Sequence, residues 1–158
     1  MFDKILVPLD GSQLAKSVFP YLEKIAKDCS VKEVVLIGIC EPPIISSDYP
    51  ASMPVDWETH VKELTNYSQI QCSLHLKDAE KHLNSLGINN IKIEARLGDA
   101  ASEIVDYSSQ NDVDLIIMAS HGRSGPSRWA YGSVADKIFR STCVPVLMVR
   151  GPGCVSGI

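Results

Sequence analysis

Short apolar runs alternate along this chain with stretches in which apolar residues recur at helical spacing. Five runs predict strands, at Lys4–Leu9, Val34–Ile39, Ile91–Ala95, Asp114–Met118 and Val144–Val149, the third of which alternates and should have one wetter face. The stretches between them predict helices. Strands separated by helices form a parallel sheet that helices cover on both faces. The sequence therefore predicts a single α/β domain, a Rossmann-like, doubly wound sheet of five parallel strands.

Capping residues, a proline and a glycine indicate where several helices begin, kink or end. Ser12 can cap a first helix, and Pro20 should kink that helix or split its first turns. A long helix is expected from about residue 57 to 86, with Gly87 as its C-cap. Asp99 should cap the next helix, which faces inward with Ile104 and Val105. A rough apolar stripe is expected along the long helix, formed by Val61, Leu64, Ile70, Leu74, Ala79 and Leu83.

Length and charge narrow the class of protein. The 158 residues suit one domain, expected over residues 1–150 and followed by a loose tail at 151–158. A net charge of −4 argues against a nucleic-acid-binding surface. We find no signal peptide and no apolar run of membrane-spanning length, so a cytoplasmic protein without a membrane partner is expected.

The cysteines carry no sign of a metal site. The chain has five cysteines, an odd number, and no two of them form a CxxC motif. They are Cys29, Cys40, Cys72, Cys143 and Cys154. We expect reduced thiols, with Cys40 and Cys143 as small core residues beside apolar runs.

A glycine-rich segment, residues 118–134, joins the fourth strand to the last helix. In a doubly wound sheet ligands bind at the carboxyl ends of the strands near the switch point, which points to the loops after strands one and four. Gly132 and Ser133 stand at a helix start, where free N–H groups favour an anion. The simpler alternative is a tight turn, but loops as long as the one between Gly122 and Gly132 are usually functional.

The segment matches neither of two common nucleotide-binding motifs. It lacks the lysine of a P-loop, and no GxGxxG follows the first strand. It resembles instead the ATP-binding motif of the universal stress protein family, G-x2-G-x9-G-[ST], here with Ala119, Gly122, Gly132 and Ser133. Alanine suits the first position if its φ is negative. The opening Lys4–Ser12 and the strands at 114–118 and 144–149 are similar to the same family, so the resemblance covers residues 1–150.

The resemblance implies a regulatory or stress-response protein that holds ATP or AMP, with Mg²⁺ or Mn²⁺ accompanying a triphosphate. It also implies a homodimer joined through the last strand, whose apolar edge invites pairing. Pro8, Ile39 and Met118 would line the adenine pocket, and Asp10 would contact the ribose or a metal. The backbone of the loop would hold ribose and phosphates at Ala119, Ser120, His121, Gly122, Arg123, Ser124 and Gly125. The helix start would close over the phosphates at Gly132, Ser133, Val134 and Ala135.

Several alternatives stay open at this point. Asp10 suits a plain Asp-Gly turn as well as a ligand contact. His121 and Arg123 suit solvated loop positions as well as contacts to phosphate, so no catalytic residue and no protein metal ligand is assigned. The expectation is no enzyme, with at most very slow ATP hydrolysis. The competing functions are a slow ATPase or nucleotidyl-transfer enzyme on the same fold, and a module that binds no nucleotide.

Overall fold

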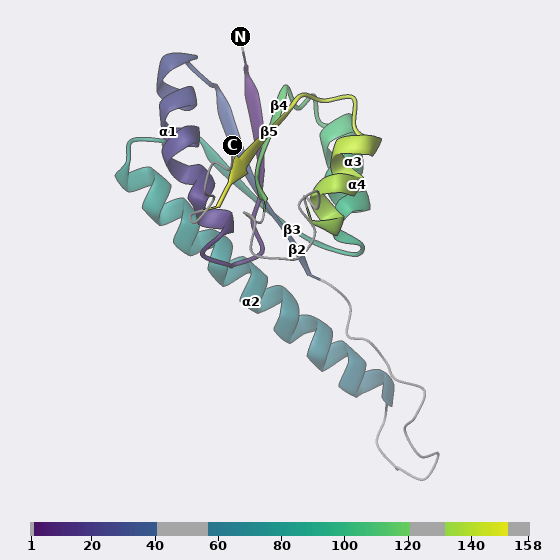
Figure 1. The fold of residues 1–158 in the computed structure, drawn as a ribbon. Coiled ribbons are helices and arrows are strands. Elements are labelled where there is room, and N and C mark those ends of the chain that lie inside the picture. The colour runs from purple at the N-terminus through teal and green to yellow at the C-terminus, as the bar shows by residue number, and fades with distance from the viewer. Residues whose placement is uncertain (1, 41–56, 121–131, 152–158) are drawn as a thin grey trace.

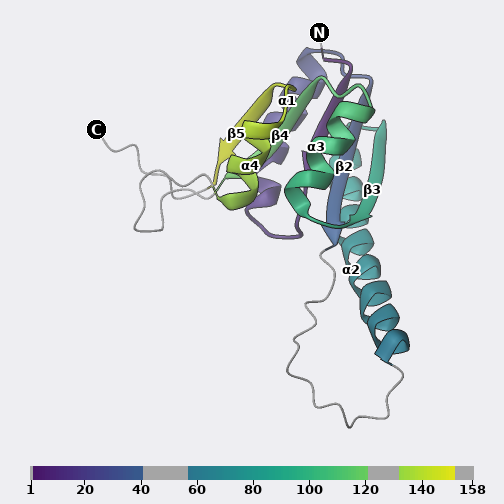
Figure 2. The ribbon, with the colours of Figure 1, turned by 90° about the vertical axis from the view of Figure 1, so that its right-hand side faces the viewer.

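The computed structural model describes residues 2–40, 57–120 and 132–151. Five parallel strands form one sheet in the order β3-β2-β1-β4-β5 (Figures 1 and 2). The strands are β1 (Lys4–Pro8), β2 (Glu33–Cys40), β3 (Ile91–Leu97), β4 (Leu115–Ser120) and β5 (Val146–Arg150). The helices are the 3₁₀ turn η1 (Ala15–Val18), α1 (Phe19–Asp28), α2 (Trp57–Ser85), α3 (Ala100–Gln110) and α4 (Ser133–Ser141). The predicted five-stranded α/β fold is confirmed, with strand ends displaced by one or two residues.

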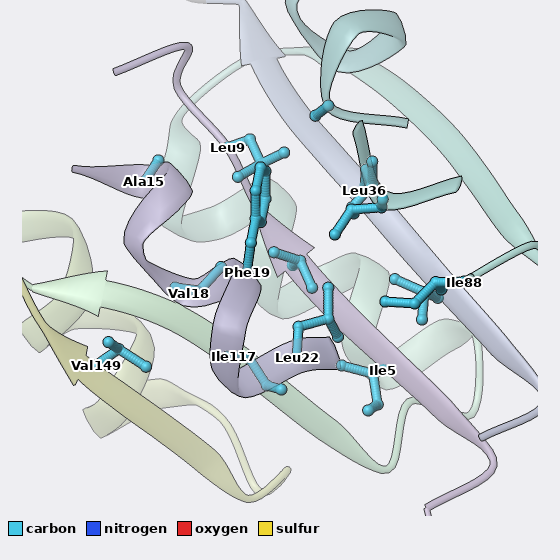
Figure 3. Close-up of a cluster of buried hydrophobic side chains, with 14 of the residues drawn as sticks. Ile5, Leu9, Ala15, Val18, Phe19, Leu22, Leu36, Ile88, Ile117 and Val149 are labelled. Atoms are coloured by element: carbon cyan, nitrogen blue, oxygen red, sulfur yellow. The ribbon is translucent and has the colours of Figure 1, made fainter. Parts of the chain in front are cut away.

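Two apolar layers hold the helices to the two faces of the sheet. Alternate residues of β1 divide between them, because successive side chains of a strand point to opposite faces. Ile5 and Val7 belong to the cluster under α1 and α2, which Figure 3 shows, and Leu6 belongs to the cluster under α3 and α4. Burial on both faces explains why β1, β2 and β4 read as nearly continuous apolar runs.

The residues that were predicted to begin, kink or end helices lie at helix boundaries in the structure. Pro20 lies in the first turn of α1, directly after the separate turn η1. The Ser12 Oγ accepts the Ala15 N–H at 3.1 Å, although Leu14 occupies the N-cap position of η1. Gly87 follows α2 with a φ of +90°. The Asp99 side chain accepts the Ser102 N–H at 3.0 Å and so caps α3.

The expected apolar stripe of α2 is wrong at three of its positions. Ala79 and Leu83 are buried as expected, but Leu64, Ile70 and Leu74 are 42%, 57% and 50% exposed. In Figure 1 the first half of the helix extends beyond the sheet, so the sheet offers it no surface to pack on. Leu74 lies in the second half, but it is two positions from Cys72 and Leu76 and so on the opposite side of the helix from them. The buried face belongs to the second half only.

The cysteine expectations are met in part. Cys40 is buried at the end of β2, but Cys143 is exposed because it lies in the turn between α4 and β5 rather than in a strand. The four cysteines within the described ranges are free thiols, and Cys154 lies outside those ranges. The proposed boundary between the domain and its tail stays a prediction, since residues 152–158 also lie outside. None of the helices in the described parts combines the length and apolarity that a membrane crossing requires.

Asp114 ties the start of β1 to the start of β4. Its Oδ2 accepts the backbone N–H groups of Asp3 and Lys4, both at 2.8 Å. These bonds, with the one from Lys4 contributing most, hold the pKa of Asp114 below its usual value. The folded state therefore favours the carboxylate, and its contribution to stability is present above the unfolded-state pKa and lost as the pH falls through the lower folded-state pKa.

We expect Asp114→Ala to lower the free energy of unfolding by about 1–2 kcal/mol at pH 7, because two N–H groups lose a charged acceptor. The difference in free energy of unfolding between the variant and wild type should shrink as the pH falls below about 4, the usual pKa of aspartate. Urea unfolding at pH 7 and pH 3 measures both. The exposed Asp106→Ala serves as a control and should differ little from wild type. A deficit of equal size at both pH values would contradict the assignment.

Candidate functional site

The order of strands reverses between β1 and β4. The chain leaves β1 toward η1 and α1 on one face of the sheet, and α4 follows β4 on the other face (Figure 1). The connections that leave the carboxyl ends of these two neighbouring strands therefore run to opposite faces of the sheet and leave a crevice between them. A cavity of about 610 Å³ lies there, within the range of roughly 300–1,000 Å³ typical of small-molecule sites.

Most of the described residues that the sequence assigned to the site line this cavity. They are Pro8, Asp10, Ile39, Met118, Ala119, Gly132, Ser133, Val134 and Ala135. Ser120 is buried at the end of β4 and lies outside the lining, with its carbonyl accepting the Gly151 N–H at 3.2 Å. His121, Gly122, Arg123, Ser124 and Gly125 lie outside the described residues. Ala119 has no positive φ, which is the condition under which alanine suits that position.

One side of the cavity is apolar. Ile39 on β2 and Met118 on β4 belong to the same core cluster, on the face of the sheet that α3 and α4 cover. Ile104 of α3 lies in the same cluster and also lines the cavity. Pro8 ends β1 between these two strands. A flat apolar group can therefore enter where the core cluster meets the cavity.

The turn after β1 brings polar groups to the cavity. Asp10 is exposed, and its Oδ1 accepts the Ser12 N–H at 2.9 Å. Gly11 between them has a φ of +81°, which glycine adopts without strain. The turn role of Asp10 is thus present in the structure, and it leaves the carboxylate at the cavity wall.

The start of α4 forms the anion-favouring end of the cavity. Its N-cap residue Gly132 has a φ of +87°, and its first helical bond runs from the Asp136 N–H to the Gly132 carbonyl at 2.9 Å. Among the described residues no side chain caps this helix, in contrast to Asp99 on α3. The N–H groups of its first turn have no partner within the helix and carry the positive end of its dipole.

An ion pair holds α4 against α3 beside this end of the cavity. The Lys137 Nζ lies 2.7 Å from the Asp99 Oδ1, which also accepts the Ser102 hydroxyl at 2.6 Å. The bond from Lys137, followed by those from Ser102, keeps the pKa of Asp99 well below its usual value. Both partners are exposed, so the ion pair adds little to the stability of the protein. Its effect is to position α4 relative to α3.

The middle of α2 supplies a wall that the sequence analysis missed. Its cavity-lining residues are Ser68, Gln71, Cys72 and His75. The His75 ring packs over the turn after β1, since a Cβ on Gly11 would lie 3.0 Å from its Cδ2. The spacing of these four residues puts them on one helical face beside Leu76 and Ala79, a signal that was available but that the search for an apolar stripe overlooked.

The described part of the cavity lining offers few metal ligands. Within the described ranges, no cluster of three or more histidine, cysteine, aspartate or glutamate side chains could bind a metal ion. Asp10 is the one carboxylate among the described lining residues. The arrangement therefore suits a ligand that joins a flat apolar group to an anion, with any metal held mainly by the ligand.

Comparison with known proteins agrees with this architecture. The sequence model of the universal stress protein family matches residues 1–150. Universal stress protein MJ0531 of Methanocaldococcus jannaschii is 28% identical over 96% of this chain and 84% of its own. The structure of UspA from Lactobacillus plantarum superposes with a TM-score of 0.75, at 23% identity over 94% of this chain and 98% of its own.

A further structural neighbour is a universal stress protein in complex with cAMP. It has a TM-score of 0.69 and 16% identity, over 94% of this chain and 97% of its own, and so bears on the fold alone. The family model covers nearly the whole chain, and the strand order and the cavity at the switch point fit it. The chain belongs to the universal stress protein family.

Proposed function

We propose that this protein binds an adenine nucleotide, ATP or AMP, and acts as a regulatory binding protein in a stress response. The observation that carries the proposal is the cavity at the switch point, apolar at Ile39 and Met118 and bounded by the start of α4. A nucleotide has the same division into a flat base and an anionic phosphate chain. The neighbour of the same fold that was solved with cAMP holds a ligand of this class, although the likeness to it bears on the fold alone.

Each part of the cavity then has a role in the proposal. The adenine lies against Pro8, Ile39 and Met118, and the ribose lies near Asp10. The phosphates approach the first-turn N–H groups of α4, where anions are stabilised. Mg²⁺ or Mn²⁺, when it accompanies ATP, is held mainly by phosphate oxygens and water, with Asp10 as the acidic side chain within reach of the cavity.

We expect the protein to bind ATP at least ten times more tightly than GTP. The slot lined by Ile39 and Met118 is apolar, so these side chains offer no partner to the ring N–H and exocyclic amine of guanine. Burying polar groups without partners is costly. Isothermal titration calorimetry with both nucleotides measures the ratio. Equal affinities, or no binding of either nucleotide, would contradict the proposal.

Hydrolysis of the bound ATP is expected to be absent or very slow. Fast phosphoryl transfer requires a cationic clamp, a firmly held metal and a group that aligns water. The described lining contains no lysine or arginine, and backbone amides bind the ground state and the transition state about equally. Phosphate release by purified protein with Mg²⁺ should stay far below about 1 s⁻¹, the low end of ordinary turnover. A rate near that value that disappears in His121→Ala would show instead an ATPase on this fold.

We also propose that the protein is a cytoplasmic homodimer joined through β5. Support for the dimer comes from the position of β5, which pairs with β4 on one side and forms an edge of the sheet on the other. An edge strand offers backbone groups that a second copy can pair with. Localisation of a tagged chain by fluorescence tests the compartment.

A further inference from the structure

Two thiols meet in the wall of the cavity. Cys40 ends β2 and is buried, while Cys72 lies on α2 and is half-buried. Both side chains line the cavity, and they interact, since Cys40 contributes to the raised pKa of the Cys72 thiol. Residues 40 and 72 are far apart in the sequence, so the fold alone brings this pair together.

Gly38 makes the room for this contact. Residues 36, 38 and 40 share the face of β2 that α2 covers, because side chains alternate along a strand. A Cβ on Gly38 would lie 2.5 Å from the Cys72 Sγ and 3.2 Å from a methyl carbon of Leu76. The absence of a side chain at Gly38 therefore lets the Cys72 sulfur sit directly on β2, close to Cys40.

The two thiols are chemically unequal. Burial, the hydrogen bond to Cys40 and the charge on Cys40 raise the pKa of the Cys72 thiol to about 12. Cys72 consequently keeps its proton at neutral pH, so the first attack on an oxidant falls to the Cys40 sulfur. A nucleophilic thiol next to a protonated second thiol is the arrangement of an oxidisable dithiol.

We propose that Cys40 and Cys72 form a reversible intramolecular disulfide when a peroxide enters the cavity. The Cys40 thiolate attacks one peroxide oxygen and breaks the O–O bond, which gives a sulfenic acid and, after protonation, one water. The Cys72 sulfur then attacks the Cys40 sulfur, and the sulfenic hydroxyl leaves with the Cys72 proton as a second water. Two thiols are oxidised by two electrons in total, and one hydrogen peroxide is reduced to two waters.

The bond would join α2 to the carboxyl end of β2 at the edge of the cavity. It closes a loop of about 30 residues, and such a cross-link stabilises the folded chain mainly by restricting the unfolded one. The other described cysteines are placed differently, Cys29 at the end of α1 and Cys143 exposed after α4. The inference goes beyond the proposed function, and its test requires no nucleotide.

The test uses the full chain with Cys29, Cys143 and Cys154 replaced by serine, treated with one equivalent of hydrogen peroxide. We expect both remaining thiols to disappear together from a maleimide titration and the mass of the monomer to fall by two hydrogens. Peptide mapping should find Cys40 linked to Cys72, and dithiothreitol should restore both thiols. The oxidised chain should also melt at a higher temperature than the reduced one. If the triple variant does not fold, the same mapping on the wild-type chain gives the answer.

Matched variants separate the pair from ordinary thiol oxidation. Cys40→Ser and Cys72→Ser, each in the triple-serine background, should form no intramolecular disulfide. Gly38→Ala should slow its formation several-fold, because the new Cβ displaces the Cys72 sulfur from β2. Two thiols that both survive the treatment in the folded chain, or that link only between chains, would overturn the proposal. So would peroxide oxidation of Cys40 to a sulfinic acid without any linkage to Cys72.

Discussion

Replacing Gly132 by alanine is expected to weaken ATP binding by more than tenfold, or about 1.4 kcal/mol. Gly132 has a φ of +87° and a ψ of 143°, a conformation that a residue with a Cβ rarely adopts. Alanine should therefore shift the start of α4 and turn the N–H groups of Ser133 and Val134 away from the phosphates. Calorimetric titration of the folded variant with ATP measures the loss.

Gly87→Ala is the matched control for this experiment. Gly87 has a φ of +90°, but it lies at the end of α2, where a new Cβ would meet only the Lys27 Cε, at 4.0 Å. Both variants should lose roughly 1 kcal/mol or more of stability from backbone strain. Only Gly132→Ala should also lose affinity. Wild-type affinity in a folded Gly132→Ala variant would remove the start of α4 from the binding site.

The features of the fold that the sequence predicted depend on local chemistry. Pro20 has no backbone N–H to donate within a helix, Gly87 can adopt a positive φ, and Asp99 can accept an N–H at a helix start. The doubly wound arrangement follows from the alternation of strands and helices, because parallel strands require crossover connections. Each of these expectations needed only neighbouring residues or a general rule of topology.

The expectations that were wrong depend on where an element lies in the fold. The apolar spacing of Leu64 and Ile70 cannot reveal that the first half of α2 extends beyond the sheet, which leaves these residues exposed. Similarly, the apolar run beside Cys143 does not reveal that the residue lies before the strand rather than in it. Periodicity indicates which residues share a face, but not whether anything covers that face.

The candidate site was predictable where a strand end defines it. The topology rule and the family resemblance both pointed to Pro8, Met118 and Gly132, which line the cavity. The contribution of α2 was missed, because α2 is distant in the sequence from the strand ends at the switch point. Its position there can be recognised only from its packing on β2. Cys72 could be paired with Cys40 only from the three-dimensional structure.

The edge of β5 allows a specific test of the proposed dimer. The Pro145 carbonyl accepts the Ile116 N–H at 2.9 Å, and the Gly151 N–H donates to Ser120 at 3.2 Å. Backbone groups of successive residues alternate in direction along a parallel strand. The N–H and C=O of Val146 and Met148 consequently point away from β4, toward the open edge where a second copy would pair.

Met148→Pro is therefore expected to convert the proposed dimer into a monomer. Proline removes an N–H that the pairing with β4 does not use, and it blocks the edge on which an antiparallel partner would align. Met148→Ala is the matched control, because it removes most of the side chain but keeps the N–H, and it should stay dimeric. Light scattering at micromolar concentration distinguishes the two states, and circular dichroism checks that both variants fold. A wild-type monomer at that concentration, or a folded Met148→Pro dimer, would show that β5 is not the interface.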